Sequence, residues 1–168
     1  MLWVLTPEPP HKIDRTVSAW QTRLDLLQGA IGEDPGFVIS RVDIDRPSPH
    51  YAFETVSLLR QEHPEDELVY LMGGDELRDL AAWKQPTDFI AACDAIGVMR
   101  RPADSVDLFT LEREFPGITG KVWFLAAPLI EISASDIRRR IKTGQPVRYF
   151  LPSAVYDLIV ERKLYQGG

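Results

Sequence analysis

Cysteine is almost absent from this sequence, which has one, Cys93, among 168 residues. A single cysteine excludes an internal disulfide and is typical of proteins that stay in a reducing cytoplasm. Long apolar runs are missing as well, since none approaches the about 20 residues that a membrane-spanning helix needs. No stretch has the pattern of a secretory signal peptide. These absences predict a cytoplasmic protein that does not act in a membrane.

An excess of positive charge is also absent. Lys and Arg number 19 against 25 Asp and Glu, which gives a formal net charge of −6. Because non-specific binding to nucleic acid depends on many phosphate contacts from Lys and Arg, we expect no nucleic-acid partner. The basic residues that do cluster lie between Arg138 and Arg148. A local basic patch on an acidic chain favours a small anionic ligand.

Several catalytic signatures are lacking. There is no Walker loop, no Gly-x-Gly-x-x-Gly fingerprint, no zinc-binding spacing of Cys and His, and no serine elbow of the hydrolase type. The three histidines, His11, His50 and His63, are scattered over expected loops. Since no nucleophile stands out, positioning and electrostatics would have to carry any chemistry. The length fits one domain, residues 1–168, with one sizeable core.

What is present is a regular alternation of strand-like and helix-like segments. Strands are expected over residues 2–5, 37–44, 68–72, 95–99 and 122–125, and helices over 17–31, 53–63, 76–82, 86–92, 136–143 and 152–162. Residues 104–120 form a variable connection with room for a helical turn. This order predicts an α/β fold, a mostly parallel sheet flanked by helices, with the 68–72 strand buried on both faces. Ligands in such folds bind beyond the carboxyl ends of the strands.

The segment from Ile132 to Arg140 carries the strongest signal for a ligand. Ser133 or Ser135 is a suitable N-cap for the following helix, and the free N–H groups and positive dipole end there attract anions. Arg138 lies in or near the first turn, where a cation is unfavourable unless an anion is bound. Two hydroxyls, backbone N–H groups and a guanidinium predict a phosphate site. An ordinary capped helix with a solvated basic face explains the same residues equally well.

Three further features are weaker. Gly73-Gly74-Asp75 ends the 68–72 strand, where Asp75 could accept hydrogen bonds from a ribose, although a tight turn explains it slightly better. Trp83-Lys84 could stack on a planar ring, but a tryptophan at this spacing is more often part of the core. Tyr51 and Thr55 open a helix, and Thr55 could face a ligand.

In chain order, these segments resemble the bacterial nicotinate mononucleotide adenylyltransferases, members of the nucleotidyltransferase superfamily with a Rossmann-like fold. The resemblance covers nearly the whole chain. It rests on Pro9-Pro10-His11-Lys12, Arg23-Leu24, Ser40-Arg41, Asp43-Ile44-Asp45-Arg46, Tyr51 with Thr55, Gly73-Gly74-Asp75, Trp83-Lys84, Arg100-Arg101-Pro102, Ile132 to Arg140 and Val147 to Pro152. The Ile-Ser…Ile-Arg segment is typical of the superfamily, and the Gly-x-Asp, Trp-Lys and Tyr…Thr elements indicate the nicotinate branch.

The resemblance implies an enzyme of NAD biosynthesis that transfers AMP from ATP to nicotinate mononucleotide, with deamido-NAD and pyrophosphate as products. It implies that Mg²⁺ arrives with ATP and is held mainly by the phosphates, with no protein metal ligands. By carry-over, Lys12 and Arg138 are catalytic. The residues that would bind ATP are Ser133, Ser135, Ile137, Arg138, Gly74, Asp75 and Arg101. Those that would bind the nicotinate nucleotide are Tyr51, Thr55, Trp83 and Lys84, with Trp83 stacked on the pyridine ring.

The chain departs from the family pattern in two places. The family begins with a strand and a loop Gly-Gly-x-Phe-x-Pro-x-His-x-Gly-His, so the resemblance implies that this chain starts at the family's second strand and lacks the first βα unit. Ala52-Phe53-Glu54 stands where the family has Thr, an aliphatic residue and Asp. The alternatives left open are a non-catalytic nucleotide-binding module of the same fold and another branch, such as the one that adenylates phosphopantetheine. Acid or amide preference and a homo-oligomeric state are open as well.

Overall fold

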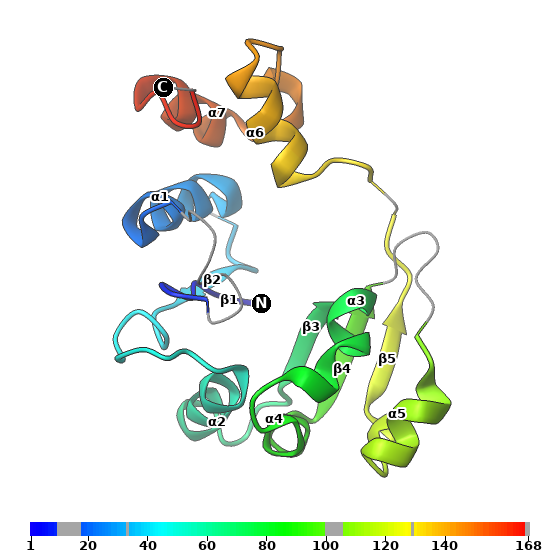
Figure 1. The fold of residues 1–168 in the computed structure, drawn as a ribbon. Coiled ribbons are helices and arrows are strands. Elements are labelled where there is room, and N and C mark those ends of the chain that lie inside the picture. The colour runs from blue at the N-terminus through cyan, green and yellow to red at the C-terminus, as the bar shows by residue number, and fades with distance from the viewer. Residues whose placement is uncertain (10–17, 33, 100–105, 129, 167–168) are drawn as a thin grey trace. The chain divides into compact units, whose positions relative to one another are not determined.

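The structure is a computed structural model of the chain, and it describes residues 1–9, 18–32, 34–99, 106–128 and 130–166. Contacts between Cα atoms divide the chain into two compact units, one made of Met1–Pro49 with Ile130–Gly168 and the other of His50–Leu129. Figure 1 gives the order of the elements along the chain. Each unit is described by itself below.

The first unit combines the N-terminal and C-terminal parts of the chain. Its elements are β1 (Leu2–Val4), α1 (Trp20–Ile31), β2 (Val38–Ser40), α6 (Ala134–Lys142), a 3-10 turn η4 (Arg148–Phe150) and α7 (Ser153–Glu161). Strands β1 and β2 are parallel, with Trp3 opposite Ile39. The helix between them is the crossover that a parallel pair requires.

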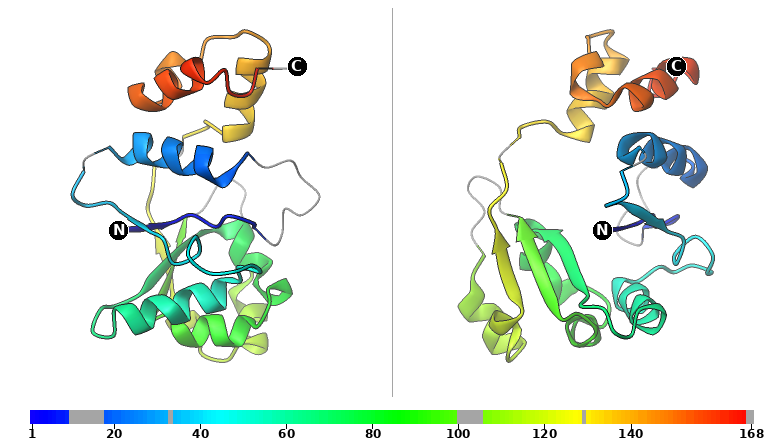
Figure 2. Two further views of the ribbon diagram at one scale, coloured as in Figure 1. Left: turned by 90° about the vertical axis from the view of Figure 1, so that its left-hand side faces the viewer. Right: turned by 180° about the vertical axis from the view of Figure 1, so that it is seen from behind.

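Helices α1 and α7 pack against each other in this unit, and Figure 2 shows both from two sides. A side chain added at Gly29 of α1 would contact Ala154 and Leu158 of α7 at 3.5 Å, so the helix backbones lie close together here. An ion pair joins Asp25 of α1 to Arg162, the C-cap residue of α7. Helices α1 and α7 therefore belong to one packed layer.

The second unit contains a parallel sheet in the order β3-β4-β5 and the helices around it. The strands are β3 (Val69–Gly73), β4 (Ala95–Met99) and β5 (Val122–Leu125). The helical elements are α2 (Ala52–Glu62), α3 (Gly74–Arg78), η2 (Leu80–Ala82), α4 (Pro86–Ala92), α5 (Leu108–Glu114) and η3 (Ile118–Gly120). They alternate with the strands in Figure 1, as in the βαβ arrangement.

The core of this unit lies on one face of the sheet. Met72, Ile96 and Val98 point to that face, where buried side chains from each helical element meet them: Val56, Leu77, Leu80, Phe89, Leu111 and Ile118. Strand β4 is central, and Ala95, Ile96 and Val98 are fully buried. Each Å² of apolar surface that is removed from water contributes about 25 cal/mol to stability. This cluster is therefore the main stabilising contribution of the unit.

The expected α/β class with parallel strands between helices is confirmed, but several boundaries differ from prediction. The strand predicted for residues 37–44 is wrong beyond Ser40, because Val42 to Asp45 form turns. The predicted 76–82 helix is divided into α3 and η2, and residues 104–120 hold α5 and η3. Leu71 is 39% exposed, so β3 is buried on one face and not on both. Among the described residues, no helix is long and apolar enough to cross a membrane.

Candidate nucleotide-binding site

The start of α6 is the segment with the strongest prediction, and its cap forms as expected. Ser133 is the N-cap residue with extended backbone angles, and its Oγ accepts a hydrogen bond from the Asp136 N–H at 3.1 Å. Ser135 is exposed in the first turn. Ile137 donates its N–H to the Ser133 carbonyl at 3.0 Å. The helix ends before Gly144, whose φ of 69° is the left-handed conformation that glycine favours at this position.

The three consecutive arginines of α6 do not have the same partners. Asp136 forms ion pairs with Arg139 and Arg140, and the hydrogen bonds from Arg140 and Arg139 hold the pKa of the Asp136 carboxyl below its usual range. Arg138 is exposed, donates to the Ser135 hydroxyl at 3.3 Å and lies 6.0 Å from the centre of the Tyr165 ring. No described carboxylate pairs with Arg138, so its charge is available to an anion. Arg138 lies in the second turn of α6, not the first.

The tip of β3 leads directly into a helix. Gly73 is the N-cap of α3, and a Cβ at this position would lie 2.4 Å from Oδ1 of Asp75, so a side chain here would force that carboxylate to move. Asp75 is half-buried in the first turn of α3, and Gly74 is buried. An acidic side chain in the first helical turn is favoured by the helix dipole. The carboxylate therefore stands at the carboxyl end of the sheet, where ligands of parallel α/β folds bind.

Trp83 packs within a group of aromatic rings near β3. Its ring lies 6.3 Å from that of Tyr70 in an edge-on arrangement and 5.1 Å from that of Phe89. Trp83 is half-buried against the core, and Lys84 beside it is exposed. The indole thus has a supported side and an accessible part, which is the arrangement that a stacking platform requires.

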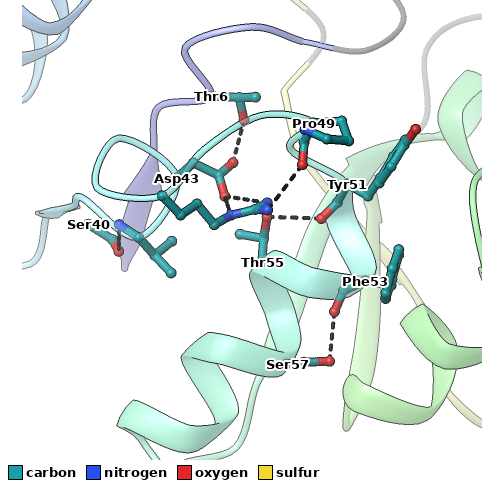
Figure 3. Close-up of polar contacts among 10 residues, drawn as sticks. Thr6, Ser40, Asp43, Pro49, Tyr51, Phe53, Thr55 and Ser57 are labelled. Carbon is teal, nitrogen blue, oxygen red and sulfur yellow. Dashed lines mark hydrogen bonds and ion pairs between the residues drawn. The ribbon is translucent and has the colours of Figure 1, made fainter.

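Tyr51 and Thr55 lie together at the start of α2, as Figure 3 shows. Tyr51 is the N-cap residue, and its ring stacks on that of Phe53 with centres 6.1 Å apart. Thr55 is buried, and its hydroxyl donates to the Tyr51 carbonyl at 3.1 Å. The first turn of α2 is therefore held by its own side chains and carries no side-chain cap.

Sequence reasoning gave no site role to three polar residues that follow β2: Asp43 and Arg46 in the first unit, and His50, where the second unit begins. Asp43 is 1% exposed, pairs with Arg46 and accepts a hydrogen bond from the Thr6 hydroxyl (Figure 3). His50, which sequence reasoning placed among scattered loop histidines, is buried, and its Nδ1 has no hydrogen-bond partner among the described residues. An Asp-x-x-Arg spacing directly after a strand was the available signal for the Asp43–Arg46 pair.

The predicted site residues thus fall into groups within each unit. The first unit holds Ser133, Ser135, Ile137 and Arg138, and the second holds Tyr51, Thr55, Gly74, Asp75, Trp83 and Lys84. Lys12 and Arg101 lie outside the described residues. Within the described part of the chain, no group of three or more His, Cys, Asp or Glu side chains could hold a metal ion. The donor groups near α6 suit the phosphates of a metal–nucleotide complex.

Comparisons with known proteins show the family to which this chain belongs. The sequence profile of the cytidylyltransferase-like family matches residues 1–140. A protein of Thermomicrobium roseum is 42% identical over 99% of this chain and 77% of its own length, and one of Thermus thermophilus is 34% identical over 99% and 83%. Each is named a "probable nicotinate-nucleotide adenylyltransferase".

A solved structure shares the fold. The nicotinic acid mononucleotide adenylyltransferase of Plasmodium falciparum, solved with NaAD, superposes with a TM-score of 0.73 over 98% of this chain and 81% of that chain, at 16% identity. The profile match and the two bacterial relatives cover most of the sequence and include α6 or its start, β3 and α2. This chain therefore belongs to the cytidylyltransferase-like family, in the branch of the bacterial nicotinate-nucleotide adenylyltransferases.

Proposed function

We propose that this protein is a nicotinate-nucleotide adenylyltransferase of NAD biosynthesis. The observation that carries the proposal is the 42% identity with a bacterial relative of that name over nearly the whole chain. The reaction joins the AMP part of ATP to nicotinate mononucleotide. A phosphate oxygen of the mononucleotide forms a bond to the α-phosphorus of ATP, the bond from that phosphorus to the bridging oxygen breaks, and pyrophosphate leaves with the electron pair.

The start of α6 is the proposed site for the ATP phosphates. Ser133 and Ser135 offer hydroxyls, and the dipole of α6 is positive at this end. Arg138 adds a guanidinium that no described carboxylate pairs with, whereas Asp136 forms ion pairs with the next two arginines. Because negative charge builds up on the leaving pyrophosphate, a cation held there lowers the barrier for transfer.

The acceptor side of the proposed site uses residues of the second unit. Trp83 would stack on the pyridine ring, with Lys84, Tyr51 and Thr55 beside it, and Gly74 with Asp75 would bind the adenosine or its ribose. By family resemblance, Lys12 is a second catalytic cation, and Arg101 contacts ATP. In this proposal residues 1–168 work as one nucleotidyltransferase domain.

ATP enters the proposed reaction as its Mg²⁺ complex, so the metal belongs to the substrate. Mg²⁺ prefers to keep several waters and to bind phosphate oxygens. The described residues offer it no carboxylate cage. We place the reaction in the cytoplasm, on the strength of the ATP substrate and the single free thiol of Cys93. The oligomeric state, homo-oligomer or monomer, is to be measured by sedimentation.

The test measures pyrophosphate release by the purified gene product with MgATP and one acceptor at a time. The proposal requires release with nicotinate mononucleotide and formation of deamido-NAD. Nicotinamide mononucleotide as acceptor measures the preference for acid over amide. Release with phosphopantetheine alone would contradict the branch assignment. Binding of ATP without release with any acceptor would identify a non-catalytic nucleotide-binding protein instead.

A further inference from the structure

The loop between β2 and α2, residues 41–49, contains two ion pairs of the same composition. Arg41 pairs with Asp45, and both side chains are exposed, at 55% and 59%. Arg46 pairs with Asp43, and these side chains are 15% and 2% exposed. The two pairs lie within six consecutive residues, so the loop itself supplies a matched comparison between a solvated pair and a buried one.

The buried pair connects parts of the chain that are far apart in sequence. One carboxylate oxygen of Asp43 accepts a hydrogen bond from Nε of Arg46 at 3.0 Å and lies 2.9 Å from Nη2 in the ion pair, and the other accepts from the Thr6 hydroxyl at 2.8 Å. Arg46 also donates through Nη1 to the Pro49 carbonyl at 3.2 Å. Figure 3 shows Thr6, Asp43 and Pro49 around this network. It therefore ties the segment after β1 to the last residue of the loop.

Apolar packing does not hold this loop in place. Asp43 is the one residue of 41–49 that is buried, and the two branched aliphatic residues, Val42 and Ile44, are only half-buried. Burying an ion pair is costly in desolvation, and well-packed apolar residues of similar volume often stabilise a fold as well or better. A buried pair is better explained where it selects one conformation. Here the conformation selected is the path of the loop toward His50 and Tyr51.

We propose that Asp43 and Arg46 are positioning residues for acceptor binding. The inference rests on the proposed function, since it takes Tyr51 and Thr55 as acceptor contacts. Arg46 holds the Pro49 carbonyl, and the chain continues through His50 to Tyr51, the N-cap of α2. The proposed role of the pair is to hold Pro49, which lies two residues before Tyr51 in the sequence, in one conformation.

The test compares the same substitutions on the two pairs. Asp43→Asn and Arg46→Lys change the buried pair, Asp45→Asn and Arg41→Lys change the exposed one, and Thr6→Val removes one hydrogen bond at nearly constant volume. KM for nicotinate mononucleotide, KM for ATP and kcat are measured for the full chain at a temperature below each variant's Tm. A small misplacement of binding groups costs up to about a hundredfold.

We expect Asp43→Asn and Arg46→Lys to raise KM for the mononucleotide by roughly tenfold or more, with a smaller rise for ATP. Thr6→Val should change it in the same direction by less, and the exposed-pair variants should stay within about twofold of wild type. Equal changes in both KM values, no change in either, or loss of folding in Asp43→Asn, Arg46→Lys and Thr6→Val alike would overturn the inference, because the pair would then be structural. A wild-type protein that ignores nicotinate mononucleotide would refute the proposed function, which is a different result.

Discussion

Removing the Arg138 side chain should separate nucleotide binding from stability. In the structure this side chain has one long hydrogen bond, 3.3 Å to the Ser135 hydroxyl, and one ring contact at 6.0 Å to Tyr165. An exposed cation–π contact is worth about 0.5–1 kcal/mol at most, and Arg138 is too far from the helix end to affect the dipole strongly. Arg138→Ala should therefore change the free energy of unfolding by about 1 kcal/mol or less.

The effect on ATP should be much larger. A hydrogen bond to a charged group contributes about 1.5–3 kcal/mol, and each 1.4 kcal/mol is a factor of ten in affinity. Arg138→Ala should then raise KM for ATP roughly ten- to hundredfold, and less for the mononucleotide. Steady-state pyrophosphate release gives the KM values, and urea titration gives the free energy of unfolding.

Arg139→Ala is the matched control for this experiment, since Arg139 is on the same helix but paired with Asp136. Its KM for ATP should stay near that of wild type. If Arg138→Ala loses stability and activity in the same proportion, or if Arg139→Ala raises KM for ATP equally, α6 is an ordinary capped helix with a basic face and the phosphate assignment is wrong.

Three further predictions concern single side chains. Ser133→Ala removes the cap of α6 and should lower the free energy of unfolding by about 1 kcal/mol in urea titration, whereas Ser135→Ala should change it little. Trp83→Ala should raise KM for the mononucleotide more than KM for ATP, with Trp83→Phe intermediate; identical KM ratios in all three proteins would remove the stacking role. Burial raises the pKa of the Cys93 thiol to about 12, so the thiolate fraction at pH 8 is about 10⁻⁴ and iodoacetamide should label the thiol only when the protein unfolds; rapid labelling of folded protein would contradict this.

The sequence predicted best where local patterns and tertiary packing agree. The 86–92 helix and the 95–99 and 122–125 strands match α4, β4 and β5 at both ends. Their apolar residues contribute to the core on one face of the sheet, and a proline opens α4. The prediction failed for residues 41–44, where Val42 and Ile44 suggested a longer strand. Beside them, Asp43 is drawn into a turn by Arg46 and Thr6, and propensity does not include that interaction.

The candidate site was predicted only in part from local patterns. Ser133 was expected as a cap from its position before a helix, and the structure confirms the cap. Asp136 pairs with Arg139 and Arg140 and leaves Arg138 without a carboxylate partner among the described residues, which was not predicted from the sequence. Helix spacing was the available signal, because residues three and four positions apart face each other, whereas Arg138 is only two positions from Asp136.

The same limit explains why the Asp43–Arg46 pair was missed. Arg41–Asp45 and Asp43–Arg46 have the same composition and nearly the same spacing, so no local rule tells them apart. What distinguishes them is Thr6, which follows β1 and reaches Asp43 across 37 positions of sequence. Burial of a charge is thus decided by a distant segment, and that segment is placed by the parallel pairing of β1 with β2. Of two similar charged pairs, the one that is removed from water is the candidate for a positioning role, and only the pairing of the strands shows which one that is.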